Sequence, residues 1–196
     1  MLAKKYIDLD ITLPNEECNY YDQISNIWRK THQIMGVNKI SFAVDFPNYN
    51  IKTDFYDNDN KCLFGNLFRI WFDEIDSEQD KIENILKANL HNFAKIDCVM
   101  ENNKTTKNYK AFIMRRIASN VPRHRRSEQK WVDSQIERRS RQKIEQINFP
   151  FIRMRSSSGN LFKLVVEKIN VDKDINGDPN GYGLSRKTQI ISIPDI

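Results

Sequence analysis

Apolar and polar residues alternate along two stretches of the first fifty residues, and this pattern predicts two half-buried strands. The first stretch, residues 7–13, ends at Pro14, and the second, residues 40–46, ends at Pro47. Between them the apolar period changes to that of an amphipathic helix, which runs from about residue 17 to Gly36. The stripe of this helix consists of Tyr20, Ile24, Ile27, Trp28, Thr31 and Met35. The chain is therefore expected to begin with a strand, a helix and a second strand.

The same strand and helix patterns continue to residue 100. Residues 67–72 are apolar on nearly both faces, which is typical of a buried strand, and Ser77 can cap a second helix. The residues at core spacing in that helix are Ile82, Ile85, Leu86, Leu90 and Phe93. Residues 95–100 predict a fourth strand. The order β-α-β-β-α-β is that of the ferredoxin-like unit, so we predict an α+β protein in which residues 1–100 form a ferredoxin-like domain.

The second half of the chain differs in charge from the first. Residues 1–100 contain 11 Lys and Arg against 16 Asp and Glu, a net charge of −5, whereas residues 101–196 contain 20 against 10, a net charge of +10. Ten of the basic residues lie between residues 115 and 143. We expect a linker at 101–108 and a second domain at 109–196. That domain would hold a short strand near 109–114, an arginine-rich helical segment at 115–147 and strands towards the C-terminus.

The arginine-rich segment has the features of a helix that binds a polyanion. Asn120 can cap it and Pro122 suits its first turn. Arg123, Arg126 and Lys130 then share one face, where like charges repel one another. A polyanion offsets that cost, because guanidinium groups form paired hydrogen bonds with phosphates and guanine edges. A solvated basic surface is the plain alternative, but the density of arginine favours nucleic acid.

Residues 152–166 predict a β-hairpin around a turn at 156–160. If Ser156 lies opposite Phe162, the even-numbered positions share one face of the hairpin. The core part of that face would be Ile152, Met154, Leu164 and Val166. The opposite face would carry Arg153, Arg155 and Lys163. Ser156 and Phe162 would then meet at the hairpin tip, a hydroxyl beside an aromatic ring.

The sequence argues against metal sites, disulfides and membrane spans. The three cysteines are far apart and form no CxxC pair, which disfavours a disulfide framework or a zinc site and fits a reducing cytoplasm. No apolar run is long enough to cross a membrane. Residues 172–177 imitate the start of a calcium loop, but Gly183 occupies the position of the closing glutamate. We predict a cytoplasmic protein without metal or cofactor.

His32 is a candidate for proton-transfer chemistry. It follows Trp28 by one helical turn and lies beside the apolar stripe, where neighbours can hold a histidine while it faces an interface. Taken alone, such a residue is more often a surface or capping histidine than a catalyst.

Four motifs that together span nearly the whole chain give these residues a context. They are the opening strand DLDITLP before a helix with His32-Gln33, the arginine helix preceded by Ser119-Asn120, Phe149-Pro150-Phe151 leading into Arg155-Ser-Ser-Ser-Gly159 and Phe162, and Tyr182-Gly-Leu-Ser185. In order and spacing they resemble the type I-F CRISPR repeat-RNA endoribonucleases of the Csy type. That family cuts precursor CRISPR RNA beside each repeat hairpin, without a metal.

The resemblance implies a catalytic role for four residues. His32 would be the general base that takes the proton of the ribose 2′-OH before the cut. Ser156 would hold this hydroxyl in line with the phosphorus, assisted by Ser158. Tyr182 would orient the imidazole or pack against it. The products would be a 2′,3′-cyclic phosphate and a 5′-hydroxyl.

The resemblance also implies an RNA-binding surface in the second domain. Phe162 would stack on the closing base pair of the stem, and Arg115 or Arg116 would read bases near the cut. The residues expected to contact RNA are Arg115, Arg116, Arg123, Arg125, Arg126, Lys130, Arg155 and Phe162. An A-form major groove is too narrow for side chains except near the end of a short helix, so a short stem-loop is expected to bind better than long duplex. The implied partners are the CRISPR repeat stem-loop and the other subunits of a type I-F effector complex.

Two other functions remain open on the sequence alone. One is a non-catalytic hairpin-RNA-binding subunit of a ribonucleoprotein complex, in which His32 is incidental. The other is a DNA-binding helix protein, such as a transcription factor or a transposition accessory.

Overall fold

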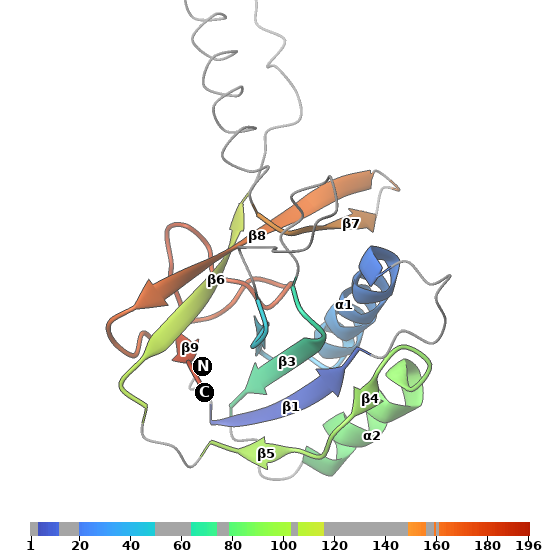
Figure 1. Cartoon of the computed structure of the whole chain (residues 1–196). Helices are drawn as coiled ribbons and strands as arrows, with labels where there is room; N and C mark the ends of the chain where they lie inside the picture. The colour runs from blue at the N-terminus through green and yellow to red at the C-terminus, as the bar shows by residue number, and fades with distance from the viewer. Residues whose placement is uncertain are drawn as a thin grey trace, which may run out of the picture.

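Two antiparallel β-sheets and two helices make up the described parts of the computed structural model (Figure 1). These parts are residues 4–11, 20–49, 64–73, 79–102, 106–115, 149–155, 159 and 161–196. The first sheet contains β1 (Lys5–Asp10), β2 (Phe42–Asp45), β3 (Leu67–Phe72), β4 (Lys95–Ile96) and β5 (Met100–Glu101). The second contains β6 (Tyr109–Arg115), β7 (Phe151–Arg155), β8 (Leu161–Val171) and β9 (Ile193–Pro194). The helices are α1 (Tyr20–Val37) and α2 (Gln79–Leu90), so the predicted α+β class is confirmed.

The first sheet has the strand order β2-β3-β1-β4, and β5 also pairs with β1. In its register Ile7, Ile70 and Val44 lie opposite one another on neighbouring strands, so they share one face. Helix α1 packs on this face, where Trp28 meets the Phe68 ring edge-on at 5.7 Å. On the other face Asp8, Arg69 and Asp45 lie opposite one another, next to the row of Tyr6, Trp71 and Ala43.

Helix α1 ends at Val37, one residue beyond the predicted end at Gly36. Gly36 lies inside the helix, and the residue with positive φ is Lys39 (55°). The amide of Ile40 donates to the carbonyl of Met35 at 2.9 Å, which is the six-to-one bond of a Schellman cap. The prediction that Gly36 closes the helix is therefore wrong, because Lys39 supplies the left-handed residue.

The predicted fourth strand, residues 95–100, is divided in two. Strands β4 and β5 both pair with β1, and the amide of Asp97 between them still donates to the Asp8 carbonyl at 3.0 Å, but the register changes by one residue from β4 to β5. The amide of Val99 donates to the carboxylate of Glu83 on α2 at 3.1 Å instead of to β1. A helix side chain has thus replaced the strand partner, which a pattern of apolar residues does not reveal.

The β7–β8 hairpin forms with a register two residues away from the predicted one. Phe162 lies opposite Met154, and Ser156 is outside the described residues. Because side chains alternate with a period of two, this shift exchanges partners without exchanging faces. The even-numbered core is accordingly buried (Ile152, Met154, Leu164, Val166), and the basic face is exposed (Arg153, Arg155, Lys163).

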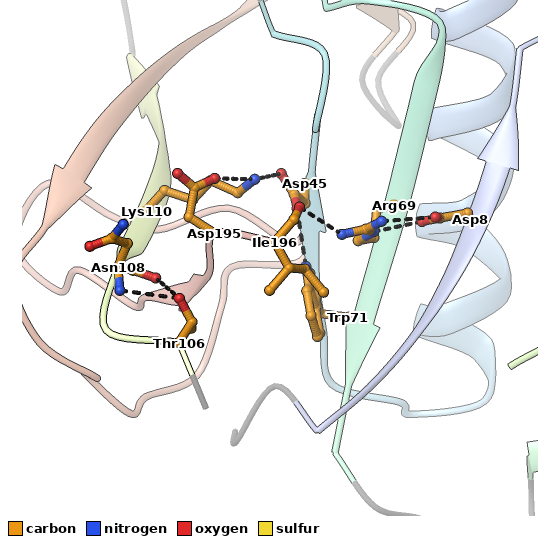
Figure 2. A network of polar contacts seen from close by, with 9 residues as sticks. All are labelled: Asp8, Asp45, Arg69, Trp71, Thr106, Asn108, Lys110, Asp195 and Ile196. Carbon is orange, nitrogen blue, oxygen red and sulfur yellow. Dashed lines mark hydrogen bonds and ion pairs between the residues drawn. The ribbon is translucent and has the colours of Figure 1, made fainter. Parts of the chain in front are cut away.

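Buried charges join the two sheets (Figure 2). Lys110 of β6 is 1% exposed and forms ion pairs with Asp45 of β2 at 3.0 Å and with Asp195 at 2.9 Å. The indole N–H of Trp71 donates to the second oxygen of Asp45 at 3.3 Å. Burial raises the pKa of Asp45, and the nearby ammonium and indole groups offset only part of that rise. Partial burial also acts to raise the pKa of Asp195, but its hydrogen bond with Lys110 outweighs this and lowers it.

A second ion pair lies on the same face of the first sheet. Arg69 binds Asp8 through two parallel hydrogen bonds, at 2.6 Å and 2.9 Å, and its guanidinium lies 4.2 Å from the centre of the Tyr6 ring. The same guanidinium donates to the carbonyl oxygen of Ile196 at 3.4 Å, so the end of the chain is held against this sheet (Figure 2).

One hydrophobic cluster contains residues of both sheets. Phe46 and Phe112 meet edge-on at 5.4 Å, and the hydroxyl of Tyr49 donates to the carbonyl of Val166 at 3.0 Å. The predicted linker at 101–108 therefore separates two sheets that share a core, and the division into domains at 1–100 and 109–196 stays a prediction.

Candidate functional site

His32 lies half-buried on the exposed side of α1, and a backbone carbonyl holds its ring. Its Nδ1 atom is hydrogen-bonded to the carbonyl oxygen of Gly181, which belongs to the last third of the chain. A carbonyl oxygen can only accept a hydrogen bond, so the proton of this contact is on Nδ1. In the neutral imidazole the other nitrogen, Nε2, is then an unprotonated acceptor. This is the nitrogen available to take a proton.

Two aromatic rings from distant segments form a row of contacts that begins at this imidazole. The ring of Tyr182 lies 4.7 Å from that of His32 at an interplanar angle of 31°. The ring of Phe162, from β8, meets Tyr182 edge-on at 6.3 Å. The fold thus gathers three of the predicted site residues. Phe162 and Tyr182 each follow His32 by 130 or more positions in the sequence. A partly exposed aromatic ring beside an acceptor nitrogen suits the binding of a nucleobase next to a reacting group.

A tight turn at residues 180–184 presents this contact to α1. The side-chain oxygen of Asn180 accepts hydrogen bonds from the amides of Tyr182 (2.9 Å) and Leu184 (3.2 Å). The carbonyl of Gly183 accepts from the amide of Val44 at 2.8 Å, so the turn covers the outer edge of β2. Sequence reasoning did not select Asn180. The available signal was an Asn followed by two glycines within three residues, which is a turn pattern.

We expect Gly183→Ala to lower the free energy of unfolding by about 2–5 kcal/mol, through left-handed strain and overpacking. Gly183 has φ of 76°, and a Cβ atom there would lie 2.6 Å from side-chain atoms of both Phe42 and Val44. Gly159→Ala is the matched control, since Gly159 has φ of 82° but open space around a Cβ. Chemical denaturation of both variants is the measurement. Equal losses would contradict a role for close packing at Gly183.

Two of the predicted RNA-binding arginines lie within the described residues: Arg115 forms an ion pair within the second sheet, and Arg155 is exposed. The predicted arginine-rich segment includes Arg115 as its first residue, but Arg115 ends β6, opposite Val165. That boundary is wrong, because the pairing with β8 continues through Arg115. Its Nε atom donates to the carboxylate of Glu167. Arg155 lies on the exposed face of β7. The remaining candidates lie outside the described residues: Ser156, Ser158, Arg116, Arg123, Arg125, Arg126 and Lys130.

No metal-binding cluster and no membrane-spanning helix occur in the part of the chain that the structure describes. Among these residues, no group of three or more His, Cys, Asp and Glu side chains could hold a metal ion. No described helix is long and apolar enough to cross a membrane.

Comparison with protein families identifies the class of this protein as CRISPR-associated. Residues 6–195 match the family described as CRISPR-associated protein (Cas_Csy4), so the match spans both sheets and the turn at 180–184. The chain belongs to the Csy4 family, whose members are endoribonucleases that bind and process CRISPR repeat RNA. The resemblance inferred from the sequence motifs is thereby confirmed. A search among curated proteins finds no match to this chain.

Proposed function

We propose that this protein is a metal-independent endoribonuclease that cleaves CRISPR precursor RNA at the base of the repeat stem-loop and stays bound to its product. The observation that carries the proposal is the hydrogen bond between His32 and the Gly181 carbonyl, which leaves Nε2 as a proton acceptor on a ring that contacts Tyr182, and Tyr182 in turn contacts Phe162. General-base catalysis by a positioned histidine contributes about 10²–10⁴ to a rate.

The proposed reaction is an internal transfer at phosphorus. Nε2 of His32 takes the proton of the ribose 2′-OH, and the resulting oxyanion attacks the adjacent phosphorus. The bond from phosphorus to the 5′ oxygen of the next nucleotide breaks, that oxygen takes a proton from water, and the protonated His32 returns its proton to the solvent. The products are a 2′,3′-cyclic phosphate and a 5′-hydroxyl, with no change in oxidation state. Ser156, assisted by Ser158, aligns the hydroxyl, and Tyr182 restrains the imidazole.

The proposed RNA surface combines one aromatic ring with the basic second half of the chain. Phe162 stacks on the closing base pair of the stem. Arg155, exposed on β7, and Arg116 approach the phosphates and bases near the cut. Arg115 reaches RNA only as far as its bond to Glu167 allows, so its contribution is smaller than the sequence suggests. In this proposal the arginine-rich segment follows the stem through Arg123, Arg125, Arg126 and Lys130.

We also propose the finer fold assignment and the cellular setting. The strand order β2-β3-β1-β4, its antiparallel pairing and the element order support a ferredoxin-like unit within residues 1–100. The second sheet and the arginine-rich segment then form the RNA-binding domain at 109–196. The protein acts in the cytoplasm and, with its product RNA, joins the other subunits of a type I-F effector complex.

A repeat hairpin with a single 2′-deoxy substitution tests this function. In excess EDTA, the protein is expected to cut the repeat hairpin RNA once, leaving a 2′,3′-cyclic phosphate that mass spectrometry of the products identifies. A hairpin with a single 2′-deoxy nucleotide before the cut is expected to bind with an affinity within about threefold but not to be cleaved, because only the nucleophile is missing.

Four results would count against the proposal. Cleavage of the 2′-deoxy hairpin would exclude 2′-OH attack, and a requirement for divalent metal would exclude the metal-independent reaction. Tight binding of the hairpin with no cleavage would favour the non-catalytic RNA-binding subunit. Rapid loss of the product hairpin in a gel-shift assay would contradict retention of the product.

A further inference from the structure

We infer that Asn180 is a positioning residue for His32, which fixes the protonated nitrogen of the imidazole through the turn at residues 180–184. The inference deepens the proposed function and rests on it, because it concerns the nitrogen that takes the substrate proton. The proposed function gives the Tyr182 ring a role in restraining His32. This inference adds that the backbone next to Tyr182, held by Asn180, orients the imidazole.

Asn180 holds the turn together through both its side chain and its backbone. Its side-chain oxygen accepts from the amides of Tyr182 and Leu184, and its own amide donates to the carbonyl of Leu184 at 2.9 Å. The carbonyl of Asn180 accepts from the amide of Gly183 at 2.8 Å. One residue thus forms four hydrogen bonds within a five-residue segment. The conformation of the intervening peptides, including the Gly181 carbonyl, depends on it.

The side chain of Asn180 contributes to the turn through its oxygen. Asn180 is 9% exposed, and its Nδ2 group has no hydrogen-bond partner among the described residues. Leaving a buried amide nitrogen unpaired costs about 1–3 kcal/mol. The two hydrogen bonds to the oxygen are therefore the contribution that this position makes to the fold.

Two consecutive carbonyls of the turn face two consecutive turns of α1. The Gly181 carbonyl accepts from His32, and the Tyr182 carbonyl accepts from the buried indole N–H of Trp28 at 2.9 Å. Trp28 and His32 are four residues apart, so they lie on the same face of the helix. The Trp28 bond fixes the register of the turn against α1, and the Gly181 carbonyl then meets the imidazole. This part of the contact leaves little space, because a Cβ atom on Gly181 would lie 3.3 Å from Cε1 of His32.

The arrangement selects one neutral form of the imidazole. Either ring nitrogen of a neutral histidine can carry the proton, and the hydrogen bond of one nitrogen decides the state of the other. With the carbonyl in place the proton is on Nδ1 and Nε2 is the base. Without the Asn180 oxygen, the amides of Tyr182 and Leu184 lose their acceptor and the turn relaxes. The imidazole then divides between both forms, one of which cannot accept the proton at Nε2.

Imidazole nitrogen NMR and single-turnover cleavage together test this inference. In the wild type, ¹⁵N shifts of neutral His32 are expected to show the Nδ1–H form. In Asn180→Ala they are expected to show a mixture, and cleavage of the repeat hairpin is expected to fall by about 10–100-fold, as for other partners that orient a functional histidine. Binding of the 2′-deoxy hairpin is expected to change less than about threefold, because the turn positions the base and not the RNA.

Two further variants act as rescue and control. Asn180→Asp keeps an acceptor oxygen for both amides and is expected to keep the Nδ1–H form and to cleave at least about tenfold faster than Asn180→Ala. Asn38→Ala removes a different asparagine, whose amide donates to the Ile34 carbonyl at 2.8 Å near the end of α1. It is expected to leave both the histidine spectrum and the cleavage rate at wild-type values.

Four results would overturn the inference. These are an Nε2–H form in the wild type, slow cleavage by Asn180→Ala with the wild-type histidine spectrum, no effect of that variant, or no rescue by Asn180→Asp. If Asn180→Ala does not fold, Gly181→Ala replaces it. Its Cβ atom crowds the ring, so a wild-type cleavage rate in that variant would overturn the inference. If the wild type cuts no RNA, the proposed function fails, but the NMR comparison still decides whether Asn180 holds His32.

Discussion

His32→Ala is expected to slow single-turnover cleavage of the repeat hairpin by about 10²–10⁴-fold, the contribution of a positioned general base. The alanine protein has no group in place of Nε2, whereas Tyr182 and Phe162 keep their places around the gap. Affinity for the hairpin is therefore expected to stay within about threefold of the wild type, so the loss is confined to the chemical step. Gel-based rates and binding to the 2′-deoxy hairpin are the two measurements.

His91→Ala is the matched control for this variant. His91 is likewise a histidine at a helix, and its Nδ1 is 3.2 Å from the carbonyl of Lys87, but it is exposed whereas His32 is half-buried. His91 lies at the end of α2. The ring contacts of the candidate site instead join α1, β8 and the turn at 180–184. Its replacement is expected to leave cleavage unchanged. If His32→Ala cleaved at the wild-type rate, or if both variants lost activity equally, His32 would not be the base.

Lys110→Met is expected to lower the free energy of unfolding by about 3–5 kcal/mol, because it leaves a carboxylate buried without its cation. Asp45 is fully buried and Lys110 is the cation nearest to it, at 3.0 Å. The same substitution releases Asp195, whose pKa Lys110 lowers. Denaturant unfolding at neutral pH measures the loss. Any change in RNA cleavage by this variant is a consequence of its lower stability.

The pH dependence of this loss identifies its cause. Burial already raises the pKa of Asp45 above its ordinary value of 3.8, and removal of Lys110 raises it further. A carboxyl group whose pKa is higher in the folded than in the unfolded protein stabilises the fold when the pH is below its unfolded-state pKa. This stabilisation is lost as the pH rises through its folded-state pKa. Asp195 acts in the same direction, since its lowered pKa stabilises the wild type only at higher pH. The deficit of Lys110→Met is therefore expected to be smallest near pH 4 and to grow towards neutral pH.

A double variant and an exposed pair complete this experiment. Asp45→Asn combined with Lys110→Met removes the unpaired charge and keeps an acceptor for Trp71, so it is expected to recover part of the loss. Lys87→Met breaks an exposed pair with Glu83, at 2.6 Å, and is expected to shift the unfolding midpoint little. A deficit independent of pH, or no recovery in the double variant, would contradict the buried-charge explanation.

The periodic elements were predictable because their apolar patterns report burial directly. Residues 67–72 were predicted as a strand buried on both faces, and β3 has these bounds. The alternating faces of the β7–β8 hairpin were also correct, although the pairing was wrong by two residues. Local pattern fixes which side of a strand is apolar, whereas the pairing depends on the loop that joins the strands.

Two of the errors occurred where a residue of another element replaced the expected partner. Glu83 takes the amide of Val99 and interrupts the fourth strand, and β8 extends the pairing of β6 to Arg115. The buried charges of Asp45 and Lys110 are of the same kind. Neither residue stands out in the sequence, because each becomes a buried ion only when the two sheets meet.

The amino-acid sequence by itself determined the α+β class, the basic second half and, through four ordered motifs, membership of the Csy4 family. It also selected His32, Tyr182 and Phe162 as chemically useful residues. Only the tertiary structure decided that His32 contacts Tyr182, that Tyr182 contacts Phe162, and that the Gly181 carbonyl accepts a hydrogen bond from His32, which places the proton of the neutral imidazole on Nδ1. The physical reason is that residue type and periodicity report on local burial, whereas the state of an imidazole depends on a hydrogen bond from a segment about 150 residues away.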